Sequence, residues 1–78
     1  MNNQEYVKKI VSYIRSYMEQ NNITQKKLEA LCKEKGAAVS QGTISNIFAK
    51  PSSARLYTLI NICEGLDISL SSLMKNIE

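Results

Sequence analysis

The sequence predicts an all-α fold in which five short helices form one small, compact domain. Its 78 residues include three glycines and one proline. These are too few turn-forming residues for a small all-β fold, whose turns should recur about every 8 to 12 residues. Apolar residues recur instead at steps of three and four, the repeat of an amphipathic helix. A chain of this length forms a single domain, which we expect to span residues 1–78.

The first helix is predicted from about Gln4 to Gln20. Residues at helical spacing form its apolar stripe: Val7, Ile10, Val11, Ile14, Tyr17 and Met18. The polar pair Asn21-Asn22 ends this helix.

The second and third helices are predicted from their ends. Thr24 and Ser40 are placed to cap them, because a hydroxyl oxygen accepts from a backbone N–H two or three residues later. Gly36 is the predicted stop of the second helix, since glycine accepts the left-handed conformation of helix ends. The predicted buried faces are Leu28, Leu31 and Cys32 in the second helix and Ile44, Ile47 and Phe48 in the third.

The fourth and fifth helices follow a loop at residues 50–53. Gly65 to Asp67 are predicted to end the fourth helix, and Ser69 is predicted to cap the fifth. The residues expected to face inward from the fourth helix are Leu56, Leu59, Ile60 and Cys63. Along one side of the fifth helix lie Leu70, Leu73, Met74 and Ile77.

The composition argues against several classes of protein. Histidine is absent, which removes the commonest general base and metal ligand. Cys32 and Cys63 match no metal-binding spacing, and we expect free, buried thiols. No apolar run approaches about 18 residues, and residues 1–5 lack the basic start of a signal peptide. We therefore expect a cytoplasmic protein that is no enzyme, lies in no membrane and takes no cofactor, metal ion or small-molecule ligand.

Positive charge is concentrated in the middle of the chain. Residues 24–55 carry six basic and two acidic side chains, whereas the rest of the chain carries four and five. A basic cluster is typical of a surface that meets nucleic acid, but it also fits an ordinary solvated face. Charge alone does not decide between these two interpretations.

Three sequence pieces occur in a fixed order: Ile23-Thr-Gln-Lys-Lys-Leu28, Val39-Ser-Gln-Gly-Thr-Ile-Ser-Asn-Ile47 and Ile62-Cys-Glu-Gly-Leu-Asp-Ile-Ser-Leu70. Over roughly residues 10–74 the chain resembles the lambda-repressor and Cro-like helix-turn-helix family, which includes regulators of the xenobiotic-response-element type. The family typically has a hydrophobic-Ser/Thr-Gln entry to helix two, a Val-Ser-x-x-Thr-Ile-Ser-x-Ile recognition helix and a Leu-Gly-Ile/Val-Ser-Leu entry to helix five. The resemblance implies a five-helix fold whose third helix enters the major groove of DNA.

The resemblance also implies which residues meet DNA. Ile44 and Ile47 match buried positions, so base reading is left to the outer surface of the third helix: Gln41, Gly42, Thr43, Ser45 and Asn46. Gln41 and Asn46 are the expected readers, because a side-chain amide can pair with adenine N6 and N7. Contacts to phosphate are expected from Gln25, Lys26, Lys50, Ser53 and Arg55. The tyrosines, Tyr57 included, are assigned to the core or its rim.

The sequence departs from the family pattern inside the motif. Residues 33–40 add a handful of positions between the second and third helices, which either lengthen the second helix or form a basic knuckle. A rotated third helix would pass base contact to Thr43, or to Lys33 and Lys35. Glu29 stands where the family favours a small residue, and Ala30 is the candidate for that packing role. Asp67 replaces a glycine, which is a mild change because aspartate tolerates the left-handed conformation.

These observations predict a sequence-specific regulator that binds a double-stranded DNA operator, a small bacterial or phage-type repressor without a separate effector domain. A homodimer is expected, because one small module buries only about 600 to 1,000 Å² on DNA and such proteins commonly pair across two half-sites. The dimer contact is expected at Leu70, Leu73, Met74 and Ile77. The alternative is a helical protein-interaction module, antitoxin-like or adaptor, that binds its partner through the fourth and fifth helices.

Overall fold

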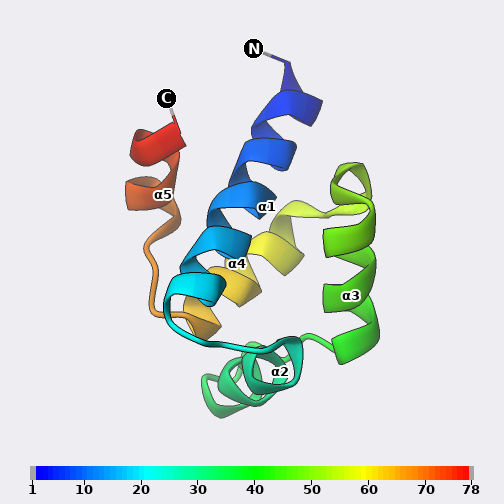
Figure 1. Ribbon diagram of the computed structural model, residues 1–78, viewed down its shortest axis with the longest axis vertical. Coiled ribbons are helices and arrows are strands. Elements are labelled where there is room, and N and C mark those ends of the chain that lie inside the picture. Colours follow the sequence, from blue (N-terminus) through cyan, green and yellow to red (C-terminus); the bar gives the residue numbers. More distant parts are fainter. Residues whose placement is uncertain (1, 78) are drawn as a thin grey trace.

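The structure is a computed structural model that describes residues 2–77 (Figure 1). Within that range it contains helices and no strand. Met1 and Glu78, the two ends of the predicted domain, lie outside the described residues. The elements are α1 (Asn3–Gln20), α2 (Gln25–Glu34), α3 (Gln41–Ala49), a short 3₁₀ turn η1 (Pro51–Ser53), α4 (Leu56–Gly65) and α5 (Leu70–Ile77). The predicted all-α fold with five helices is confirmed.

Side-chain caps begin four of the helices. In each, a polar side chain accepts a hydrogen bond from the backbone N–H three residues later, which satisfies a donor that has no partner inside the helix. The pairs are Asn2 with Glu5 at 2.9 Å, Thr24 with Lys27 at 3.1 Å, Ser40 with Thr43 at 3.1 Å and Ser69 with Ser72 at 3.4 Å. The predicted caps at Thr24, Ser40 and Ser69 are therefore confirmed.

One C-terminal motif ends α1, α2 and α4. A residue with positive φ follows each helix, and the backbone N–H of the next residue donates to a carbonyl five positions back, as in a Schellman motif. The positive-φ residues are Asn22 at 55°, Gly36 at 71° and Asp67 at 57°. The closing hydrogen bonds are Ile23 to Met18 at 2.8 Å, Ala37 to Cys32 at 2.9 Å and Ile68 to Cys63 at 2.9 Å.

The long turn between α2 and α3 is anchored by this motif. α2 continues to Glu34, and Lys35 is its C-cap. After Gly36 the chain runs back to α3 with Ala37 and Val39 buried. α2 ends at Glu34, and the turn after it packs on the core through these two residues instead of projecting as a knuckle.

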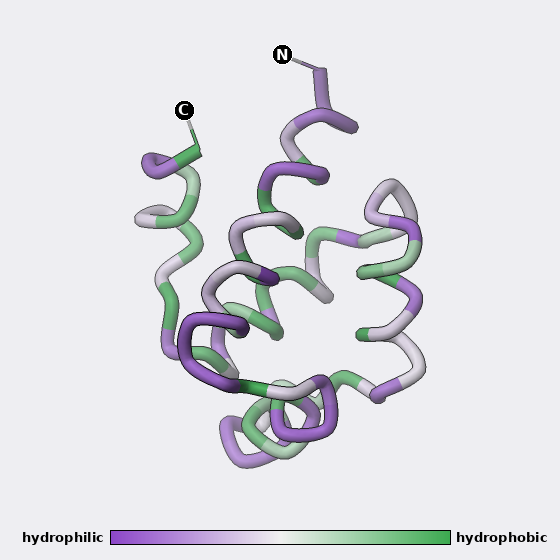
Figure 2. The backbone as a smooth tube through the Cα atoms, in the orientation of Figure 1, coloured by the Kyte–Doolittle hydropathy of each residue, from purple (hydrophilic) through white to green (hydrophobic). Residues whose placement is uncertain are grey.

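The core lies between α1, which runs beside α5, and the other three helices: α4 behind α1, α3 to its right and α2 below (Figure 1). The tube in Figure 2 is hydrophilic at the connection from α1 to α2 and hydrophobic over much of α4 and the segment that leads into α5. The buried cluster consists of Ile10, Val11, Ile14, Met18, Leu28, Cys32, Val39, Ile44, Ile47, Leu59, Ile62, Cys63, Leu66 and Leu73. Residues predicted as buried that are only half-buried at its edge are Val7, Tyr17, Leu31 and Phe48.

The predicted inward face of α4 is partly wrong. Leu56 is 64% exposed and Ile60 is 40% exposed, although both were expected in the core. The large apolar residues of α4 that face inward are Leu59, Ile62 and Cys63, and Leu66, directly after the helix, is also buried. Both sets have helical spacing, so α4 carries two overlapping apolar stripes, and its packing against α2 selects one of them.

The two cysteines are free and buried, as predicted. Burial raises the pKa of the Cys63 thiol to about 11 and also raises the pKa of Cys32. Both groups are therefore protonated at neutral pH and behave as small apolar side chains.

α2 and α4 approach closely at Cys32 and Gly65. A Cβ atom built on Gly65 would lie 2.5 Å from the Cys32 sulfur and 3.1 Å from the Cys32 backbone. Since part of this obstacle is backbone, the two helices would have to move apart to admit any side chain.

We expect Gly65→Ala to lower the free energy of unfolding by about 1 to 3 kcal/mol through overpacking. Gly42→Ala is the matched control, because Gly42 is also helical and has open space around its Cβ position. This control should gain about 0.5 to 1 kcal/mol from the better helix former. Urea unfolding of both variants measures the difference, and equal stabilities would contradict the close approach.

Candidate nucleic-acid interface

α3 has one buried and one exposed face. Ile44 is fully buried and Ile47 is 3% exposed, and both belong to the core. The five predicted base-reading residues are all exposed: Gln41, Gly42, Thr43, Ser45 and Asn46. The burial of two isoleucines three positions apart therefore turns the polar face of this helix outward.

Two side chains hold the N-terminus of α3. The Ser40 hydroxyl accepts from the backbone N–H of Thr43 and also lies 2.8 Å from the Thr43 hydroxyl. The Glu29 carboxylate on α2 accepts from the backbone N–H of Gln41, at 2.8 Å. Sequence reasoning missed the role of Glu29, and its suggestion that Ala30 packs in place of a small family residue is wrong, because Ala30 is exposed.

Arg15 of α1 holds the other end of α3. Its Nη2 atom donates to the carbonyl oxygen of Phe48 at 2.7 Å, and its guanidinium carbon lies 5.3 Å from the centre of the Phe48 ring. α3 itself has no acidic residue in its first turn and no basic residue in its last. The charges that complement its helix dipole therefore come from α2 and α1.

A groove of about 290 Å³ joins α3 to the start of α4. It brings together two predicted base readers, Thr43 and Asn46, with Arg55. Tyr57 also lines this groove and is 62% exposed. Its predicted place in the core or its rim did not include a part in this surface. The available signal was its position two residues after Arg55, in the first turn of α4.

The residues predicted to contact phosphate differ in exposure and in hydrogen bonding. Lys26, Lys50 and Arg55 are exposed, and Gln25, the first residue of α2, is half-buried. The Ser53 hydroxyl donates to the carbonyl oxygen of Lys50 at 2.7 Å and so stabilises the η1 turn. A phosphate contact from this hydroxyl would have to replace that hydrogen bond.

A comparison with protein families matches residues 14–73 to the helix-turn-helix family. The match covers most of the chain, runs from α1 into α5 and includes both α2 and α3. The chain belongs to this family. The resemblance to lambda-repressor and Cro-like proteins is thereby confirmed, and the protein is a DNA-binding helix-turn-helix regulator, of a family that is not typically enzymatic. Searches of curated proteins and of solved structures returned no match.

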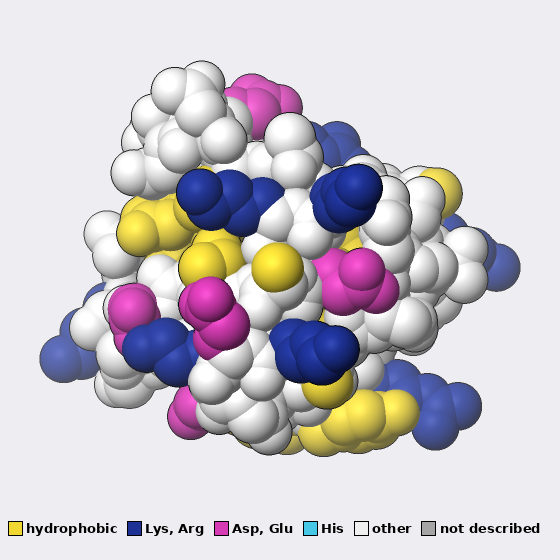
Figure 3. All heavy atoms as spheres, turned by 90° about the horizontal axis from the view of Figure 1, so that it is seen from below, with side chains coloured by type: hydrophobic (Ala, Val, Ile, Leu, Met, Phe, Trp, Pro, Cys, Tyr) yellow, Lys and Arg dark blue, Asp and Glu magenta, His cyan; other side chains and the backbone are white. Residues whose placement is uncertain are grey.

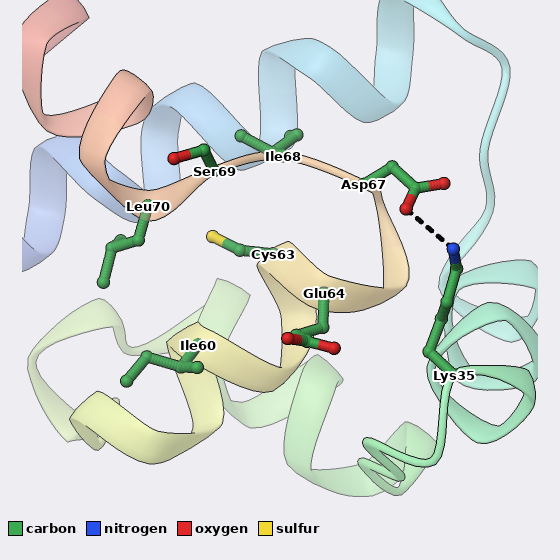
Figure 4. Close-up of a pocket in the computed structure, with 8 residues that line it drawn as sticks. All are labelled: Lys35, Ile60, Cys63, Glu64, Asp67, Ile68, Ser69 and Leu70. Atoms are coloured by element: carbon green, nitrogen blue, oxygen red, sulfur yellow. Dashed lines mark hydrogen bonds and ion pairs between the residues drawn. The ribbon is translucent and has the colours of Figure 1, made fainter.

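Not all basic residues of this helix-turn-helix protein lie on the face of α3. Lys35 forms an ion pair with Asp67 at 2.7 Å, beside a groove of about 340 Å³ at the α4 and α5 end (Figure 4). The hydrogen bond to Asp67 raises the pKa of Lys35. Figure 3, seen from the end where α2 lies, shows basic and acidic side chains interspersed over that face. Lys35 is thus partnered away from α3.

The predicted dimer contact needs one correction. Leu73 is fully buried in the core, so it is not part of any exposed contact surface. The other three residues of that prediction, Leu70, Met74 and Ile77, are half-buried. The large apolar residues that are exposed lie instead on α4: Leu56, Tyr57 and Ile60. Ile60 and Leu70 line the same groove in Figure 4, together with charged and polar residues.

Two features are absent from residues 2–77. Within this range no three histidine, cysteine, aspartate or glutamate side chains gather as a metal site would require. None of the helices described has the length and apolar run that crossing a membrane demands.

Proposed function

We propose that this protein is a sequence-specific repressor of the small bacterial or phage type, in which residues 1–78 form one DNA-binding domain and α3 reads the major groove. The observation that carries the proposal is the amphipathic character of α3: Ile44 and Ile47 are buried, and Gln41 and Asn46 are exposed. A side-chain amide donates and accepts at once, which matches the N6 and N7 edge of adenine. Occupying an operator is sufficient for repression and needs no further surface.

The exposed cations around α3 would set its register on the duplex. Lys26 lies in the first turn of α2, and Lys50 and Arg55 flank the η1 turn. Contacts from such positions to the sugar-phosphate backbone orient a protein without reading sequence. Tyr57 joins this group as an amphipathic side chain in the groove that Asn46 and Arg55 line.

A salt titration tests the function itself. Binding to a random-sequence duplex should be measurable at low salt and should weaken by more than about tenfold between 50 and 200 mM salt, because neutralised phosphates release counterions. Fluorescence anisotropy of a labelled duplex measures this. Absence of binding at the lowest salt would overturn the proposal and favour a protein-interaction module, for which the exposed Leu56 and Ile60 of α4 are the supporting observation.

Alanine variants separate base readers from residues that contact phosphate. Gln41→Ala or Asn46→Ala should cost about 1 to 3 kcal/mol on an operator selected from a random DNA pool and relax preference at one base position. Lys50→Ala or Arg55→Ala should weaken binding to all sequences alike and reduce the salt slope by about one unit.

Lys35→Ala is the control for these variants, because Lys35 is paired with Asp67. Titration of matched and single-mismatch operators gives the comparison. If Lys35→Ala changes the base preference and Gln41→Ala does not, the assignment of α3 as the reading helix is wrong.

We infer that the protein binds its operator as a homodimer. The molecule measures 33 × 22 × 21 Å, and its one recognition helix serves one half-site, whereas half-sites lie about 34 Å apart. The apolar residues available for pairing are Leu70, Met74 and Ile77 of α5 and Leu56 and Ile60 of α4. Sedimentation with operator duplex at micromolar concentration should show two chains per duplex. A strict complex of one chain per duplex would contradict this inference.

A further inference from the structure

Glu29 of α2 connects the two helices of the motif at the N-terminus of α3. Its Oε2 atom accepts from the backbone N–H of Gln41, at 2.8 Å. Gln41 is the first residue of α3 and the first of the proposed base readers. Glu29 itself is half-buried, and this hydrogen bond lies at the surface of the protein. The carboxylate of Glu29 is thus hydrogen-bonded to the backbone of Gln41, whose side chain is proposed to read a base.

The carboxylate occupies a place that also attracts phosphate. The first N–H groups of a helix have no partner within it and carry partial positive charge, which favours an anion there. In α3 the N–H of Thr43 is satisfied by Ser40, and that of Gln41 by Glu29. A DNA phosphate that approached the same helix end would have to compete with this carboxylate.

Two lysines accompany Glu29. Lys26 and Lys33, three positions before and four after it, lie on the same side of α2. Together with Glu29 they line a groove of about 550 Å³ between α2 and the turn that leads to Ser40. The two lysines of this groove attract a DNA phosphate, and the Glu29 carboxylate repels it. The sugar-phosphate backbone is therefore favoured beside the lysines and disfavoured at the start of α3.

The geometry points to Glu29 as a positioning residue that holds Gln41 for base reading and disfavours phosphate at the N-terminus of α3. This inference rests on the proposed function of the protein. Non-specific affinity comes essentially from phosphate contacts. A carboxylate at this place therefore lowers affinity for random DNA, while its hydrogen bond keeps the backbone of Gln41 in one position. Both effects raise discrimination in favour of the operator.

Three variants separate the charge from the hydrogen bond. Glu29→Gln keeps an oxygen acceptor and removes the charge, whereas Glu29→Ala removes both. Glu34→Gln is the matched control, since Glu34 is the exposed last residue of α2 and its substitution changes the charge by the same amount. Each variant is titrated with a selected operator, its single-mismatch series and a random duplex, and its thermal unfolding is measured.

We expect Glu29→Gln to bind random duplex about two- to fivefold more tightly, the effect of one carboxylate at a helix terminus, with base preference unchanged and the unfolding temperature slightly lower, because the charge no longer complements the dipole of α3. Glu29→Ala should in addition lose the base preference that Gln41→Ala removes. Glu34→Gln should leave the ratio of operator to random affinity unchanged. The inference is overturned if Glu29→Gln and Glu34→Gln act alike and Glu29→Ala keeps the base preference.

A second readout needs no DNA. The amide proton resonance of Gln41 should move upfield in Glu29→Ala, because its hydrogen bond to an oxygen is lost, and should stay in place in Glu34→Gln. An unmoved resonance in Glu29→Ala would overturn the positioning role. If the parent protein binds no duplex, the proposed function and the effect on DNA both fail, whereas this resonance separately shows whether Glu29 holds Gln41.

Discussion

α3 is held at both ends by charged side chains that belong to other helices. Glu29 of α2 accepts from the backbone N–H of Gln41, and Arg15 of α1 donates to the carbonyl of Phe48. Between these ends the burial of Ile44 sets the rotation of the helix. With both termini and the rotation constrained, the polar face of α3 has one orientation relative to the rest of the molecule, which any account of DNA recognition by this chain requires.

The frame that supports α3 depends on the contact between α2 and α4. At Gly65 the two helices are so close that a side chain has no room beside Cys32. The Schellman motif that follows α2 returns the chain over Cys32, through the hydrogen bond from Ala37, and carries it to the cap at Ser40. The position of α2 thus determines where α3 begins.

Local features of this fold could be predicted from the sequence, and features set by tertiary packing could not. The caps at Thr24 and Ser40 and the stop at Gly36 depend on residues within one turn of the chain, so their residue types are informative. α4 has two apolar stripes of equal spacing, and only its contact with α2 decides that Ile60 faces outward. The hydrogen bond of Glu29 to α3 spans twelve positions across a turn of irregular length, which no periodic pattern encodes.

We propose that the exposed face of α3, with the cations beside it, is the surface that meets DNA. Titrating ¹⁵N-labelled protein with duplex DNA and following the backbone amide resonances tests it most directly. The largest shifts are expected in residues 41–46, at the start of α2 and in residues 50–57. Shifts confined to the second half of α4 and to α5, with α3 unaffected, would contradict it.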